Sequence, residues 1–288
     1  MIKLDVVFAD AHCHSNPVEG LGAEKICKKF KDYGGWFIAL IGLSPTHYGL
    51  EPSFENFLKA YRITIEECRK VRSLGMEVSC LVGFHPAEVD KLVNRRGMKL
   101  EEVLELAEKL LKSVIKLFKE GLVNGIAEVG RPHYRTEPQF IVTSELIMNK
   151  ALQYAKDWGL IVHLHLEQGG LITILDIKSR TEYIGTPINK VLLHHVRPGT
   201  AEHAIKCNLN ISIPGLEPLV KIATSKYPPR YVFESDFIDD PRRPGVVIEP
   251  WNLALNQLRV LREGIVNEDY LWKINVDNII NIYGVEPP

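Results

Sequence analysis

The segment from residue 77 to residue 129 contains one complete strand–helix–strand unit. Two short apolar runs, EVSCLVGF (77–84) and GIAEV (125–129), flank the longer stretch EEVLELAEKLLKSVIKLFKE (101–120). The middle stretch repeats its apolar residues every three or four positions, which predicts an amphipathic helix. The flanking runs are rich in Val, Ile and Leu, as expected of parallel strands that helices cover on the outside. The positions that form the apolar stripe are Val103, Leu106, Leu110, Val114 and Leu117.

The same alternation continues along the whole chain. Strand-like runs lie at 5–12, 36–43, 77–84, 125–129, 160–166, 189–195, 209–213 and 230–235. Helical spacing is clear at 54–74, 101–120, 144–158, 199–207 and 251–262, weaker near 22–32, 170–181 and 216–225, and is followed by a terminal helix near 268–281. Eight strand–helix units predict an α/β fold, a closed (β/α)₈ TIM barrel, with a doubly wound open sheet as the alternative. No linker divides the chain, so we expect a single domain over residues 1–288.

Composition narrows the class of protein. The 288 residues carry 35 Lys+Arg against 36 Asp+Glu, a formal net charge of −1, with 45% hydrophobic and 25% charged residues. This is a globular mixture, and it excludes binding to nucleic acid through bulk positive charge. No run of 18 apolar residues predicts a membrane span. The N-terminus lacks the features of a signal peptide, and the five scattered cysteines favour a reduced, cytoplasmic compartment.

Polar residues gather where the predicted strands end, which is where parallel barrels carry their chemistry. Six of the ten histidines fall at the ends of the first, fifth and sixth strands. The two histidines of a His-x-His pair on a strand point to the same face. The strand-end groups are Asp10, His12 and His14; His85; Glu128; His163 and His165; His194 and His195; and Glu234 and Asp236.

This set of side chains predicts a metal centre. Imidazoles mixed with carboxylates suit Zn, Mn, Fe or Ni, and the absence of a cysteine cluster argues against a structural zinc site. A single His-x-His pair is weak evidence, because two histidines flanking a strand end need have no function. The whole set around one barrel mouth is much more specific.

The chain resembles the TatD-type metal-dependent hydrolases, a branch of the amidohydrolase superfamily. The resemblance rests on Asp10-x-His12-x-His14, on Gly83-Phe84-His85-Pro86, on Glu128 followed by Gly130, on the histidines of the fifth and sixth strands, and on Glu234-Ser235-Asp236. These motifs run in order from residue 10 to residue 245, and the ending SDFIDDPRRPG is most similar to an archaeal-type branch.

The resemblance implies a site for two divalent ions, with Mg, Mn and Zn as candidates. His12, His14 and Asp236 would bind the first ion, Glu128 would bridge the two, and His165 and His194 would complete the second site. Two alternatives stay open. His163 could replace His165, although we expect it one layer lower in the barrel, and His195 could replace His194, which we expect to point to the opposite face.

Substrate contacts are less well specified. The resemblance places His85 near the metals, and Arg131 and His133 lie where a phosphate or sugar would be gripped. Arg135, Arg242 and Arg243 are further candidate phosphate contacts. Two roles are open for Glu234: it could be a hydrogen-bond partner for a ligating histidine, or a residue packed in the core. The sequence departs from the bacterial pattern at Arg131-Pro132-His133-Tyr134, where a Leu-Asp pair is usual, and at Glu167, where an arginine is common.

The implied chemistry is hydrolysis of an ester, most simply a phosphodiester of DNA cleaved as by a 3′-exonuclease. A bound divalent ion lowers the pKa of its water toward about 7 and supplies hydroxide. Asp236 would act as ligand and general base, and Glu128 as the second catalytic carboxylate. The substrate could instead be a small phosphoester.

Two rivals remain. The first is a superfamily hydrolase of amides, lactones or phosphotriesters; many of these bridge their metals with a carboxylated lysine, which the predicted strand 125–129 lacks. The second is a non-catalytic metal-binding barrel, which would have no use for so complete a ligand set.

Overall fold

A computed structural model of the chain describes residues 6–242 and 247–288. Its strands form one parallel sheet in the order β8-β7-β6-β5-β4-β3-β2-β1-β9, so neighbours in sequence are neighbours in space. The strands are β1 (Phe8–His14), β2 (Gly35–Ile41), β3 (Glu77–Val82), β4 (Gly125–Gly130), β5 (Ile161–His165), β6 (Val191–Leu193), β7 (Asn210–Pro214), β8 (Val232–Glu234) and β9 (Phe237–Ile238).

The last strand closes the sheet into a barrel. Its first half, β8, pairs with β7, and its second half, β9, pairs with β1. At the break between the halves, the Ser235 amide donates to Asp10 Oδ1 (2.8 Å) and the Asp236 amide donates to the His12 carbonyl (2.9 Å). Asp10 therefore joins the first strand to the last. The predicted TIM barrel is confirmed, and the open-sheet alternative is wrong.

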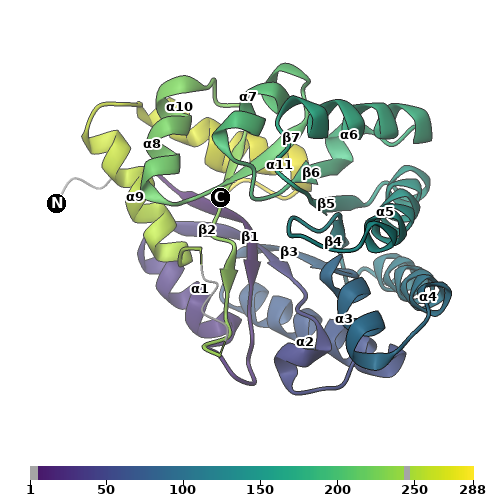
Figure 1. Ribbon diagram of the computed structural model, residues 1–288. Helices are drawn as coiled ribbons and strands as arrows, with labels where there is room; N and C mark the ends of the chain where they lie inside the picture. Colours follow the sequence, from purple (N-terminus) through teal and green to yellow (C-terminus); the bar gives the residue numbers. More distant parts are fainter. Residues whose placement is uncertain (1–5, 243–246) are drawn as a thin grey trace.

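Helices form an outer ring around the strands (Figure 1). All the predicted helices are present, although the terminal one is divided by a π-helical turn, η3 (Lys273–Asp277). The sequence prediction missed α3, which follows β3 directly. The α-helices are α1 (Ala23–Asp32), α2 (Phe54–Ser73), α3 (Ala87–Arg96), α4 (Leu100–Lys119), α5 (Pro138–Trp158), α6 (Leu171–Ile184), α7 (Pro198–Lys206), α8 (Glu217–Lys226), α9 (Pro250–Arg262), α10 (Glu268–Trp272) and α11 (Asn278–Tyr283). Two short 3₁₀ turns, η1 (Pro45–Tyr48) and η2 (Ile188–Lys190), complete the connections.

Two layers of apolar side chains position the polar mouth. One layer lies between the strands and the ring of helices. The second lies inside the barrel, where Phe37, Leu81, Ile161 and Leu192 meet the C-terminal helix through Tyr283. Because strand side chains alternate, the inward positions nearest the strand C-terminal ends are left for the histidines and carboxylates. No helix in the described part of the chain is long and apolar enough to cross a membrane.

Candidate metal centre

The centre of the barrel mouth is the carboxylate of Glu128, which is 7% exposed. Its Oε1 lies 3.5 Å from His12 Nε2 and 3.3 Å from His14 Nε2. Its Oε2 lies 2.9 Å from His165 Nδ1 and 2.9 Å from His194 Nε2. Each carboxylate oxygen therefore faces its own pair of imidazoles.

Strand geometry brings these five side chains together. His12 and His14 share the inward face of β1, two residues apart, while Glu128 lies two residues before the end of β4 and His165 ends β5. His194 follows the last residue of β6. The C-terminal ends of parallel strands meet at one rim, so residues far apart in sequence become neighbours there.

A buried chain of hydrogen bonds fixes the His12 ring. The Tyr283 hydroxyl donates to the Ala11 carbonyl (2.8 Å), so it accepts from Nε2 of His163 (3.1 Å). The Nδ1 of His163 is then the acceptor for Nδ1–H of His12 (3.1 Å), which leaves the lone pair of His12 on Nε2, facing Glu128. His163 thus lies beneath the cluster, one layer lower than His165 as expected, and orients the His12 ring.

His14 is oriented in a similar way. Its Nδ1 lies 3.0 Å from the carbonyl of Ile41 and must donate to it. Its Nε2 is therefore unprotonated in the neutral ring and points at Glu128. Such an outer hydrogen bond to a backbone carbonyl is typical of histidines that bind metals.

Burial sets the charge states of the cluster. It lowers the pKa of His12 and holds the pKa of His194 well below its usual range. Burial also depresses the pKa of His14, but its hydrogen bond and attraction to Glu128 raise it overall. Burial opposes the ionised form of Glu128, yet the neighbouring imidazoles, His194 and His85 foremost, hold its pKa well below the usual value. An ionised carboxylate among largely neutral imidazoles is the state that binds a metal.

Two imidazole nitrogens of the cluster lack partners. His12 Nε2 and His165 Nε2 are buried and make no hydrogen bond within residues 6–242 and 247–288. Buried polar atoms are nearly always satisfied, so these two atoms indicate a missing partner such as a cation. Four groups have ligand atoms that all lie within 4.8 Å of one another: His12, His14 and Glu128; His85, Glu128 and His165; His133, His165 and His195; and His12, His194 and Glu234.

The two carboxylates beyond β8 occupy different positions. Glu234 is fully buried and accepts from the His195 amide and the Ser212 hydroxyl, both at 2.5 Å. Asp236 follows at φ 49° beside His12, and burial raises its pKa. In the described part of the chain, Asp236 is not among the tight ligand groups, so its role as a ligand stays a prediction.

Comparison with known proteins agrees with this geometry. Residues 9–284 match the family described as TatD related DNase. The chain belongs to this family. MJ1127, an uncharacterized protein of Methanocaldococcus jannaschii, is 30% identical over 287 residues, which cover 96% of this chain and 95% of the relative.

Solved structures share the fold of this TatD-family chain. The TatD homolog YJJV of Escherichia coli has a TM-score of 0.66 at 17% identity, covering 97% of this chain and 98% of that one. A mutant of a PTE-like lactonase from Deinococcus radiodurans also has a TM-score of 0.66, at 13% identity and with 97% and 96% coverage. The chain is therefore a metal-dependent hydrolase with a TIM-barrel fold, as the motifs predicted.

The prediction for His195 is wrong in one respect. We expected His194 and His195 to point to opposite faces, but their ring centroids lie 4.1 Å apart. Strand alternation does not apply, because β6 ends at Leu193 and His195 has a φ of 46°. The His195 ring contacts the Leu166 carbonyl through Nε2 (3.1 Å), and burial lowers its pKa to about 3.

His85 and His133 lie at the outer edge of the cluster. Nδ1 of His85 accepts from the amide of Ala87 (3.0 Å), so Nε2 carries the proton and faces Glu128 Oε2 at 3.6 Å. A protonated Nε2 is a hydrogen-bond donor and not a metal ligand, which fits the expected substrate contact. His133 is exposed, and its Nδ1 lies 3.5 Å from His195 Nε2.

The structure gives Arg131 a different role from the expected phosphate contact. Its guanidinium pairs in parallel with Glu167 (2.8 and 2.9 Å) and also contacts Glu145 and Asp176. The side chain is 9% exposed, so it is committed to these carboxylates after β5 and on α5 and α6. The two departures from the bacterial pattern, at Arg131 and Glu167, are in fact partners.

The other candidate phosphate contacts are also not concentrated at the mouth. Arg242 pairs with Asp240 (3.0 Å) and lies 3.4 Å from Glu19. Arg243 lies outside the described residues. Arg135 stays a candidate.

Sequence reasoning missed two residues at the site, Tyr283 and Lys91. Tyr283 lies 271 residues after His12, and nothing in its local pattern indicates that it orients His163. Lys91 lies on α3, which was not predicted. The i,i+3 spacing of Glu88 and Lys91 directly after His85-Pro86 was the available signal.

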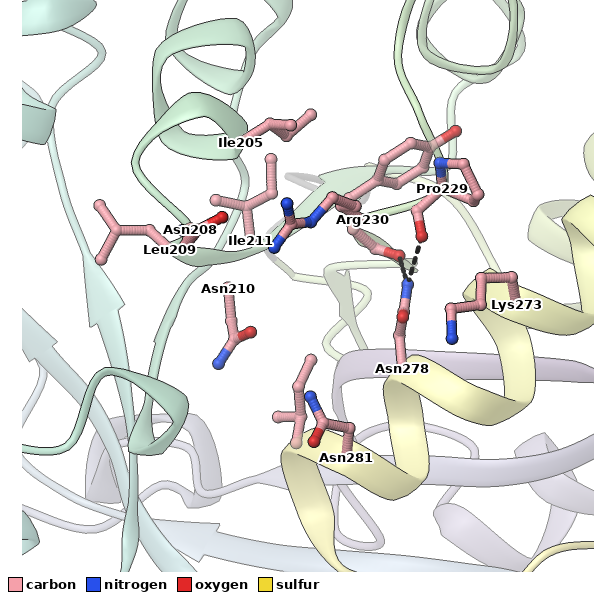
Figure 2. A pocket seen from close by; sticks show the side chains of 12 residues that line it. Ile205, Asn208, Leu209, Asn210, Ile211, Pro229, Arg230, Lys273, Asn278 and Asn281 are labelled. Atoms are coloured by element: carbon pink, nitrogen blue, oxygen red, sulfur yellow. Dashed lines mark hydrogen bonds between the residues drawn. The ribbon is translucent and has the colours of Figure 1, made fainter.

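A cavity of about 280 Å³, drawn in Figure 2, lies where β7 and β8 begin, at the end of the barrel away from the metal centre. Asn278 donates there to the carbonyls of Pro229 (3.1 Å) and Tyr231 (2.8 Å). The described lining contains no histidine or carboxylate, and the N-terminal face of a barrel usually serves stability. We therefore place the chemistry at the metal centre.

Proposed function

We propose that this chain hydrolyses phosphoesters with two divalent ions, and that the end of a DNA strand is the first substrate class to test. The observation that carries the proposal is the division of Glu128, whose two oxygens face separate pairs of histidines. A carboxylate placed in this way is suited to join two ions, and two-metal sites are common in phosphoester hydrolases.

The side chains divide into two ligand sets. His12, His14 and Asp236 would hold the first ion with Glu128, and His165 and His194 would hold the second with the same carboxylate. Bound ions lower the pKa of water and neutralise charge on phosphate oxygens. Mg, Mn and Zn are the candidates, and an imidazole-rich set favours Zn or Mn.

Asp236 is proposed to accept the proton of the attacking water. Burial raises its pKa, which makes its carboxylate a better base than an exposed aspartate. His85, protonated on Nε2, is placed to donate a hydrogen bond to the substrate beside Glu128.

The test begins with metal content and turnover. We expect two ions per chain after chelation and reloading with Mn or Zn, and release of mononucleotides from 3′-labelled single-stranded DNA. 4-Nitrophenyl phosphate, 4-nitrophenyl acetate and a lactone are assayed in parallel. Turnover of the lactone or acetate alone would assign the chain to the amide and lactone hydrolases, and no turnover with both ions bound would favour a non-catalytic barrel.

The base is tested by Asp236→Asn. We expect kcat to fall on the order of 100-fold, since general-base catalysis contributes about that much. Asp277→Asn, an exposed aspartate paired with Lys273, is the control and should leave kcat unchanged. Full metal-dependent activity in Asp236→Asn would contradict the assignment.

A further inference from the structure

A cavity of about 440 Å³ opens directly beside the metal centre. Its volume is in the range of small-molecule sites. One wall belongs to the centre already described, and the other is built by the segment after β2, by β9 and by α3. The centre contributes His14, His85 and Glu128, and the opposite wall contributes Leu43, Ser44 and Lys91.

Glu88 and Ser44 form a hydrogen-bonded group that holds Lys91 in this wall. Lys91 Nζ lies 2.6 Å from Glu88 Oε1, three residues before it on α3. The same oxygen accepts from the Ser44 hydroxyl (2.7 Å). Glu88 is completely buried, whereas the Lys91 side chain is one quarter exposed, so the ammonium is anchored from behind and open in front.

The Lys91 ammonium has unused donors. It carries three N–H groups, and within the described chain Glu88 is its only recorded hydrogen-bond acceptor. It is also the only Lys or Arg among the described residues that line this cavity. The same cavity is lined by His85 and Glu128, so the ammonium shares one space with the reacting groups.

Two of the other cations predicted to grip phosphate are already paired with carboxylates. Arg131 is bound by three carboxylates, and Arg242 is paired with Asp240. An anionic group that extends from the metal centre into this cavity therefore meets Lys91.

We propose that Lys91, anchored by Glu88, binds an anionic group of the substrate that lies next to the bond being cleaved. The group is a phosphate or a carboxylate, since an ammonium binds either as a point charge. This inference rests on the proposed function, because it places the scissile bond at Glu128 and its histidines.

Two pairs of substrates isolate the anionic group. The dinucleotide pTpT is compared with TpT, and mono(4-nitrophenyl) glutarate with 4-nitrophenyl butyrate, so that the members of each pair differ by one anionic group. We expect a preference for the charged member on the order of tenfold, expressed in KM, which corresponds to one charge-assisted hydrogen bond. The pair that shows the preference identifies phosphate or carboxylate as the natural group.

Lys91→Met should remove this preference by raising KM for the charged member more than for the uncharged one, while Lys91→Arg should retain part of the preference. Lys70→Met is a matched control, because Lys70 also pairs at i,i+3 with a buried glutamate, Glu67 (2.7 Å), but lies on α2 outside the cavity. If Lys91→Met unfolds more readily than this control, the double variant Lys91→Met/Glu88→Gln replaces it, since it leaves no unpaired buried charge.

The outcomes separate the inference from the proposed function. If the substrates are turned over and Lys91→Met keeps the full preference for the charged member, the inference is overturned and the proposed function stands. If no substrate is turned over, the proposed function fails, and titration calorimetry of metal-loaded protein with glutarate and butyrate decides the inference. Tighter binding of glutarate that is lost in Lys91→Met supports it, and equal affinities overturn it.

Discussion

At the scale of single residues, the centre depends on what the outer nitrogens of its histidines touch. His12 is held through His163 by Tyr283, and His14 by the Ile41 carbonyl. These contacts select the tautomer that presents Nε2 to Glu128. The ligand set follows from which residues end the strands, whereas their orientation depends on contacts made across the barrel.

Arg131 offers a prediction at the same scale. Arg131→Met should lower the free energy of unfolding by about 1–3 kcal/mol, because it leaves Glu167 without its cation and leaves Arg180 to pair with both Asp176 and Glu145. This expected loss of stability is smaller than for a fully buried ion pair, because the carboxylates are about one third exposed. Urea titration measures it.

The pH dependence of this loss has a defined sign. Burial opposes ionisation of Glu167 and Asp176, but Arg131 and its neighbours hold the pKa of both carboxyls below their usual values. Their contribution is therefore present above the unfolded pKa of about 4 and is lost as the pH falls below it, so the gap between wild type and variant should narrow in acid. Arg69→Met, which removes an exposed pair with Glu66, is the control and should change stability by less than about 0.5 kcal/mol. A loss no larger than that of the control would contradict the buried role of Arg131.

The same residues show what the sequence can and cannot reveal. His12, His14, Glu128 and His165 were recognisable because each ends an apolar run. The orientation of His195 was not, because it depends on β6 stopping at Leu193, and strand length is not visible in the pattern NKVLLHH.

At the scale of elements, strand packing is tight at β4, which carries Glu128. A Cβ on Gly125 would lie 2.2 Å from the Ile161 carbonyl oxygen of β5 and 3.1 Å from a side-chain carbon of Leu81 on β3. Glycine therefore lets β4 approach both neighbours. All eight barrel strands were predictable because buried strands are continuous in apolar residues, whereas α3 was missed because it buries only Val89 and Leu92 among its apolar residues.

Gly125→Ala tests this packing. It should lower the free energy of unfolding by about 1–3 kcal/mol, the usual cost of forcing a methyl group into a filled core. Gly199→Ala is the control, since a Cβ there meets nothing within 4 Å, and it should be neutral or slightly stabilising. Equal thermal midpoints for the two variants would show that β4 can move away from β5.

At the scale of the whole molecule, charge balance limits how the chain can hold a polymer. A sum of 35 cations and 36 anions provides no general attraction for a polyanion, and the cations near the mouth are largely paired. The barrel instead concentrates its binding in one centre and one adjacent cavity. The sequence could predict the overall balance, but not that Arg131 is already engaged, because its partners lie 14 to 45 residues away.

This balance predicts a weak dependence on salt. If single-stranded DNA is gripped through one or two phosphates, log KM should rise against log [KCl] with a slope of about 0.7 to 1.4, since each phosphate contact on a single strand contributes about 0.7. The measurement is KM for a short oligonucleotide between low and moderate KCl at fixed metal concentration. Lys91→Met should reduce the slope by about one such contact, whereas Lys70→Met should not change it. A slope several times steeper would mean that the strand tracks across a much larger surface than the metal centre and its cavity, since only a longer row of phosphate contacts releases that many counterions.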